Sequence, residues 1–265
     1  MRRLSLPLVI LACIALAALL TWVAVSGSFG RRAPPAARVP EMAVPHPLPP
    51  FRKIDVAGSA DVSLVQGEVE SVSLPAQPRE QGLVTAEVRD GTLYIESLDH
   101  EHWWDIVVGN RDNRPPIVVA FRNVDAIVAA GTVNITAWKM RADQLRVSGA
   151  GGTSLRIDDL DARDLKVTGA GALRADLAGR AAQAEITISG AGDFRGAKLA
   201  TQDANVTVAG AGKVTINAQK TLKATISGAG SVEYLGDPEV TQRVSGAGRV
   251  RRRDAAGAGM QVALQ

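Results

Sequence analysis

The segment that decides the fold runs from Leu165 to Leu177 and reads LKVTGAGALRADL. Apolar and polar residues alternate on both sides of Gly169-Ala170-Gly171, which is the period of a β-strand with one buried face. A glycine loop that follows a strand can also cradle a phosphate at the start of a helix. The segment therefore allows two interpretations, a nucleotide-binding loop or a bend within an all-β protein.

Repetition of the triplet decides between the two interpretations. The first glycines of its six copies are Gly149, Gly169, Gly190, Gly210, Gly228 and Gly246, so the steps are 20, 21, 20, 18 and 18 residues. A phosphate loop occurs once, no copy has the third glycine of a dinucleotide loop, and no helical period follows residue 50. Coils of 18–21 residues predict an all-β solenoid, a parallel β-helix in which coils of three short strands stack at about 4.8 Å.

Strand parity predicts which side chains face the core. In the coil around Gly149 the inward set includes Leu145, Val147, Leu155 and Ile157. Parity also places both glycines of every triplet inside, where the tube pinches or bends and a Cβ would collide or force a disfavoured φ. These structural glycines are Gly149, Gly151, Gly169, Gly171, Gly190, Gly192, Gly210, Gly212, Gly228, Gly230, Gly246 and Gly248. The alanine inside each triplet is expected to point outward.

Strands are also predicted before the repeats. FRKIDVAGSADVSLVQG, which begins at Phe51, alternates with period two, and Ile117–Phe121 is a short apolar strand. Asp90-Gly91 joins two alternating segments and predicts a tight hairpin.

The N-terminal part of the chain differs in composition from the rest. Met1-Arg2-Arg3 precedes an apolar run from Leu4 to Val25, which has the features of a secretory signal and is also long enough to span a bilayer. We expect an exported protein of the periplasm or cell surface, with contact to a membrane only through residues 4–25 if that run is not cleaved. The predicted parts are 1–26, a signal peptide or membrane anchor; 27–50, a proline-rich linker; 51–253, the folded domain; and 254–265, a flexible tail.

Composition excludes several kinds of chemistry. Cys13 is the only cysteine and lies in the apolar run, so the folded part has no disulfide, thiol nucleophile or thiolate ligand. Lysine and arginine number 30 against 27 acidic residues, and two of those cations lie at the extreme N-terminus. The remainder is nearly neutral, so no nucleic-acid partner is expected.

Several segments together resemble a known family. The repeated [VI]-[ST]-G-A-G, FRKIDVAGSADVSLVQG, RDGTLYIES and YLGDPEVTQRVSGAGRVRR resemble the bacterial family called putative auto-transporter adhesin head, GIN domain, over about Phe51 to Arg253. The resemblance implies an exported, all-β, right-handed β-helical domain of the bacterial envelope. It brings no established catalytic motif, and HEHWWD is an insert relative to the family.

Charged and aromatic residues give few candidates for a catalytic or binding site. Asp176, Asp193 and Lys213 point outward, and Asp193 and Lys213 occupy the same place on successive coils, which predicts a surface ion pair rather than catalysis. His100 and His102 lack a full metal-ligand set, so no metal or other cofactor is expected. Trp103 and Trp104 either anchor their loop or form a contact patch. The run Arg249, Arg251, Arg252 and Arg253 is expected to be a solvated end strand.

Two hypotheses about function follow. The first is a non-enzymatic, adhesin-like module that binds an envelope protein or glycan and that can be oligomeric. The second is a carbohydrate-active β-helix enzyme, a lyase or hydrolase, which requires outward carboxylates and aromatics that converge in one cleft. No such column is evident in the sequence, which favours the first hypothesis.

Overall fold

Alternation in the sequence becomes alternation of burial in the structure, a computed structural model that describes residues 45–74, 84–97 and 116–253. In β2 (Lys53–Gln66), the side chains of Ile54, Val56, Val62 and Leu64 are buried, and most residues between them are partly or fully exposed. The described residues belong to one compact unit, Met42–Gln265. No helix in the described ranges is long and apolar enough to cross a membrane.

Every regular element in the described ranges is a strand. They are β1 (His46–Pro47), β2, β3 (Ser71–Ser73), β4 (Val84–Arg89), β5 (Thr92–Ser97), β6 (Ile117–Phe121), β7 (Ala126–Gly210), β8 (Lys213–Gly228), β9 (Ser231–Leu235), β10 (Glu239–Gly246) and β11 (Arg249–Arg252). The prediction of an all-β protein is therefore confirmed. β1 lies within the proline-rich segment that was predicted to be a linker, and it pairs with β3.

One large sheet contains all eleven strands. Its main path runs β1-β3-β6-β2-β7-β8-β9-β11, with β10 paired to β8 and β5 paired to β2. Most pairs are parallel, and the antiparallel pairs are β1–β3, β3–β6 and β4–β5. The predicted hairpin is confirmed between β4 and β5, where Asp90 and Gly91 have φ of 49° and 69°. Two positive φ values fit a turn that matches the strand twist.

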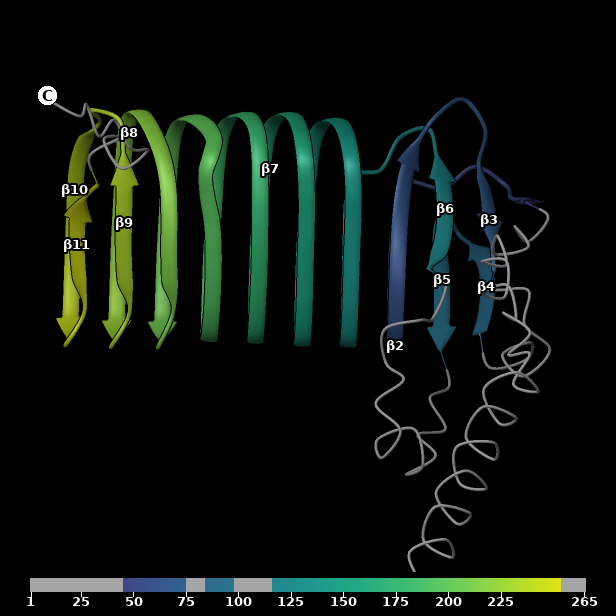
Figure 1. Cartoon of the computed structure of the whole chain (residues 1–265), viewed down its shortest axis with the longest axis horizontal. Coiled ribbons are helices and arrows are strands. Elements are labelled where there is room, and N and C mark those ends of the chain that lie inside the picture. The colour runs from purple at the N-terminus through teal and green to yellow at the C-terminus, as the bar shows by residue number, and fades with distance from the viewer. Residues whose placement is uncertain (1–44, 75–83, 98–115, 254–265) are drawn as a thin grey trace, which may run out of the picture. The chain divides into compact units, whose positions relative to one another are not determined.

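β7 is long because it bends back on itself several times, and its successive passes lie side by side (Figure 1). One column of glycines with positive φ marks the bends: Gly58, Gly131, Gly151, Gly171, Gly190, Gly210, Gly228 and Gly246. Each glycine after Gly58 lies directly against the preceding member of the column, as the paired registers of β2, β7, β8 and β10 and the close backbone approaches show. We call the stretch from one of these glycines to the next a turn.

The core lies on the inward side of the passes and consists mainly of small and branched side chains, with a few larger ones such as Phe121 and Phe194. The residues expected to face inward around Gly149, including Leu145, Val147, Leu155 and Ile157, are buried. Thr153 is buried with them, and its hydroxyl has no hydrogen-bond partner. The alanines inside the triplets are exposed, as expected: Ala150, Ala170, Ala191, Ala211, Ala229 and Ala247.

The prediction that both glycines of each triplet face inward is wrong. One glycine forms the bend and is exposed, and the other is buried or half-buried beside it. Before residue 180 the bend glycine is the second of the triplet, as in Gly171, and from residue 190 it is the first, as in Gly190. Gly190 therefore lies against Gly171, not against Gly169, and the turn between these two bends is 190 − 171 = 19 residues long.

Space at the inner corner explains the buried glycine. Beside bend Gly171, a Cβ on Gly169 would lie 2.6 Å from Leu173 Cδ2, and beside bend Gly190, a Cβ on Gly192 would lie 2.6 Å from Ile188 Cγ2. Each corner has room for one large side chain. At the Gly171 bend this side chain is Leu173, after the bend, and at the Gly190 bend it is Ile188, before the bend. A glycine occupies the position that faces it. Parity failed at the bend residue because its positive φ turns the chain direction.

Candidate functional site

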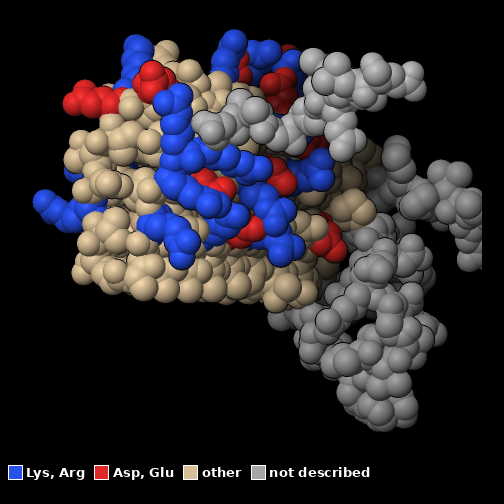
Figure 2. Space-filling model, turned by 60° about the vertical axis from the view of Figure 1, so that its left-hand side comes forward, with Lys and Arg blue, Asp and Glu red and all other residues tan. Residues whose placement is uncertain are grey.

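Charged side chains on neighbouring strands are held in register on the outer surface that follows the glycine bend. Two adjacent columns cross four successive passes, with one residue of each column on every pass. The first column is Asp193, Lys213, Ser231 and Arg249, and the second is Arg195, Thr215, Glu233 and Arg251. Figure 2 shows that basic and acidic side chains gather on one side of the stack, beside a largely uncharged region.

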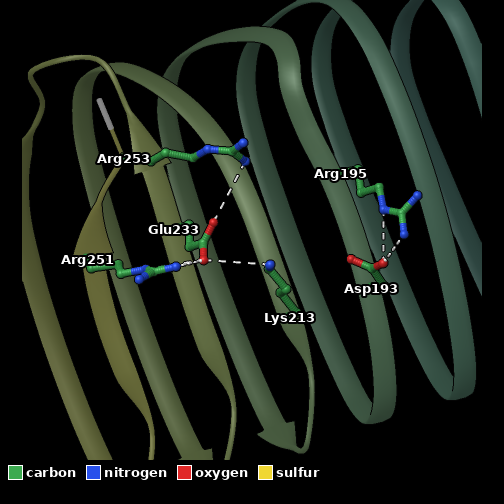
Figure 3. A network of polar contacts seen from close by, with 6 residues as sticks. All are labelled: Asp193, Arg195, Lys213, Glu233, Arg251 and Arg253. Atoms are coloured by element: carbon green, nitrogen blue, oxygen red, sulfur yellow. Dashed lines mark hydrogen bonds and ion pairs between the residues drawn. The ribbon is translucent and has the colours of Figure 1, made fainter. Parts of the chain in front are cut away.

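Glu233 on β9 is the centre of a cluster of cations. Arg251 donates two hydrogen bonds to its Oε1, from Nη2 at 2.5 Å and from Nε at 3.2 Å. Lys213 Nζ lies 3.6 Å from the same oxygen, and Arg253 Nη1 lies 3.8 Å from Oε2. Figure 3 shows these three cations converging on Glu233 from β8, from β11 and from the residue after β11.

The cations bury the carboxylate at a position where a side chain should face solvent. The side chain of Glu233 is only 6% exposed, whereas those of Lys213, Arg251 and Arg253 are 53–63% exposed. The hydrogen bonds from Arg251 and the neighbouring charges of Lys213 and Arg253 lower the pKa of Glu233, and desolvation opposes them only in part. Glu233 is therefore a fixed anion that orients three cationic side chains.

The predicted ion pair between Asp193 and Lys213 is not present, although the two residues are register neighbours. Arg195 donates to Asp193 Oδ2 from Nε at 2.9 Å and Nη2 at 2.6 Å, while Lys213 turns to Glu233 (Figure 3). A guanidinium on the same strand that directs two donors at Asp193 Oδ2 satisfies this carboxylate better than a single ammonium does.

The C-terminal arginines also differ from the prediction. Arg251 and Arg253 contact Glu233, and Arg252 Nη1 lies 2.9 Å from Asp237. The run is exposed but it is not merely solvated, because three of its four arginines have acidic partners. A period-two pattern alone cannot show that acidic residues of the preceding turn, Glu233 and Asp237, lie within reach of these arginines.

A second charged cluster lies in a groove about midway between successive glycine bends. Asp161 accepts two hydrogen bonds from Arg180, at 2.8 and 2.7 Å, and one from Arg141 at 2.8 Å. These three residues come from successive turns, and Arg163 and Asp143 line the same groove. The hydrogen bonds from Arg180 lower the pKa of Asp161. The cluster is a ladder of ion pairs across turns.

The structure places the predicted glycines in two groups. The bend glycines are Gly151, Gly171, Gly190, Gly210, Gly228 and Gly246, and the corner glycines are Gly149, Gly169, Gly192, Gly212, Gly230 and the half-buried Gly248. Trp103, Trp104, His100 and His102 lie outside the described residues. Within the described ranges, no three histidine, cysteine or acidic residues come together as a group that could hold a metal ion.

Sequence reasoning missed two residues. Glu233 was hidden because its position has outward parity. Trp138 is the second, with 78% of its surface exposed on β7, next to the register pair of Leu64 and Ala137. A tryptophan at outward parity after Ala137 is the signal that could have found it, because an exposed indole can contact a partner.

The fold and the site define an all-β protein with one large, mostly parallel sheet and an outer surface of charged side chains held in register. The chain belongs to the family described as "Putative auto-transporter adhesin, head GIN domain", whose profile matches residues 50–238. No curated protein matches the chain.

Solved structures with a similar fold come from Bacteroides and Parabacteroides. A putative adhesin from Bacteroides fragilis has a TM-score of 0.68 at 19% identity, over 79% of this chain and 95% of that one. A putative lipid binding protein from Parabacteroides distasonis has a TM-score of 0.60 at 18% identity, over 80% and 96%. A putative adhesin from Parabacteroides merdae has a TM-score of 0.54 at 20% identity, over 80% and 95%. At these identities the similarity concerns the fold.

Proposed function

We infer that this chain is a non-enzymatic, adhesin-like binding module of the bacterial envelope, whose partner is an envelope protein or glycan. The observation that carries this proposal is the charged surface around Glu233, where three cationic side chains from two strand passes point at one carboxylate and remain more than half exposed. Preformed, exposed side chains lower the cost of ordering an interface when a partner binds.

The architecture supports a role in display. The stacked column of bend glycines and the parallel pairing favour a right-handed parallel β-helix, because parallel crossovers are right-handed in nearly all proteins. A solenoid of this type presents a long, regular outer surface. The apolar run from Leu4 to Val25 favours export, by cleavage or as an anchor, and the family description is consistent with a location in the envelope.

A binding screen with a parallel activity assay tests the proposal. The full chain, purified in mild detergent, is applied to a glycan array and to immobilised envelope extracts, and the recovered glycans are analysed for shortened products. We expect retention on at least one envelope component without new reducing ends or unsaturated uronates. Release of such products would replace the proposal with a carbohydrate-active enzyme, and absence of retention on every surface would refute the binding role.

A further inference from the structure

We propose that the outer surface around Glu233 binds a linear polyanionic polysaccharide along the stacking direction of the strands. The cations that form this basic face are Arg195, Lys213, Arg249, Arg251 and Arg253. The inference rests on the proposed binding function and specifies the chemical class of its partner.

Regular spacing is the first argument. The four passes that carry Asp193, Lys213, Ser231 and Arg249 are consecutive and in register, so their outward side chains recur at strand spacings of about 4.8 Å, and the cations stand on the first, second and fourth passes. A linear anionic chain that lies across the strands therefore meets cations on three of the four successive passes.

Uncompensated charge is the second argument. The basic face holds five cations and two carboxylates, Asp193 and Glu233. The carboxylates are the less exposed groups, at 31% and 6%, because the guanidinium and ammonium groups cover them. An approaching ligand thus meets positive charge first. The groove around Asp161 is closer to balance, with Arg141, Arg163 and Arg180 set against Asp143 and Asp161.

The residue types select oxyanions. Four of the five cations are arginines, whose planar guanidinium groups bind carboxylate and sulfate oxygens in pairs and are less strongly hydrated than ammonium groups. Arg251 and Arg195 each direct two donors at one carboxylate oxygen within the protein, which leaves other donors of each guanidinium for a ligand.

In the described part of the chain, this face lacks the exposed apolar and aromatic side chains that favour other polyanionic partners, namely membranes and single-stranded nucleic acids. Inserted apolar side chains strengthen membrane association, and exposed aromatics that stack on bases strengthen the binding of single-stranded nucleic acid. The large exposed apolar residues in the described ranges are Val65, Val69, Tyr94, Trp138 and Val244, and none of them lies on β8, β9 or β11. A flexible anionic glycan needs neither feature.

A charge-neutralised variant with a matched control tests the inference. Lys213→Gln/Arg249→Gln removes two charges from one column of the basic face, while Glu233 keeps Arg251 and Arg253. Lys223→Gln/Arg243→Gln removes the same two residue types from exposed positions on β8 and β10, before the bend glycines. The full chain and both variants are titrated with heparin, polygalacturonate, neutral dextran, single-stranded DNA and vesicles of anionic phospholipid, and each variant is checked for unchanged melting temperature.

We expect both polyanionic polysaccharides to bind the wild type, and added salt to weaken that binding. The first variant should bind at least about tenfold more weakly, which is about 1.4 kcal/mol. The control should stay within about twofold, because distant surface charges are screened.

Each of the other outcomes overturns a defined part of the reasoning. Equal losses in the two variants, or none in the first, would remove the site. Tighter binding of DNA or vesicles would replace the partner class. Retention of dextran or envelope extract without binding of either polyanion would refute the inference but leave the proposed function standing. Failure to bind any glycan or extract would refute the proposed function itself.

Discussion

Replacement of Gly190 by alanine tests the glycine column most directly. Gly190 has a φ of +123°, and a Cβ built there would lie 2.6 Å from the carbonyl oxygen of Gly171 on the preceding turn. A non-glycine residue in such a conformation costs about 1–3 kcal/mol. The overlap with a backbone oxygen adds to this cost, because a carbonyl in a paired strand cannot swing away as a side chain can. We therefore expect Gly190→Ala to lower the free energy of unfolding by at least about 2 kcal/mol.

The neighbouring alanine provides the control. Ala191 is exposed, so Ala191→Ser should change the free energy of unfolding by less than about 0.5 kcal/mol. Urea melts of both variants and the wild type give the free energies, provided that the dependence on urea is unchanged. The same contrast should recur at Gly210, where φ is +126° and the Cβ would lie 2.5 Å from the Gly190 carbonyl oxygen. Glycine variants as stable as Ala191→Ser would show that the bends accept side chains and that the column has another origin.

Further outcomes follow from the corner, the buried acid, the exposed tryptophan and the N-terminal run. Gly192→Leu should overpack its corner and cost about 1–3 kcal/mol. Adding Ile188→Gly should recover part of that loss, since the corner then resembles that of Gly169 and Leu173; strictly additive free energies in a double-mutant cycle would contradict this. The lowered pKa of Glu233 stabilises the fold above the ordinary glutamate pKa, and this contribution is lost as the pH falls through the lowered value. Glu233→Gln should therefore be less stable than the wild type at neutral pH and lose less stability in acid, and parallel pH profiles would exclude the cluster as a source of stability. Trp138→Ala should leave the free energy of unfolding within about 0.5 kcal/mol of the wild type, and a larger loss would mean that the indole packs against the protein. Cell fractionation with mass spectrometry should find the chain in the envelope, either starting near Gly27 or retaining Leu4–Val25, whereas a full-length cytoplasmic chain would disprove export.

Period-two alternation predicted the strands and most of the core because it depends on nothing beyond each strand. Ile186 and Ile188, or Val206 and Val208, are buried since every second residue of a strand faces the same side. The Asp90-Gly91 hairpin was predictable for a similar reason, because its two positive φ values are a local requirement. Parity failed only at the bend glycine itself, which is exposed, and the same parity resumes two residues later, as Gly149, Gly151 and Thr153 show.

The charged site was less accessible to sequence reasoning. Arg251 pairs with Glu233, which is 18 residues earlier, and Arg195 pairs with Asp193 within its own strand. Whether an arginine pairs with an acid on the neighbouring pass or with one on its own strand depends on the relative placement of the passes and on the reach of each side chain. Sequence spacing established that Asp193 and Lys213 are neighbours, but it could not show that each has a better partner.

The Gly-Ala-Gly triplet has a consequence for how the gene can change. Because glycine stands at both ends, a shift of the bend by two residues still places a glycine at the bend and another at the inner corner, as Gly171 and Gly190 illustrate. Two codons gained or lost beside a triplet would keep every side chain on its own side of the strand. One codon gained or lost there would exchange inside for outside along the pass. Insertions or deletions of an even number of codons should therefore be tolerated at these bends. The length of a turn can then vary while the same side chains stay buried.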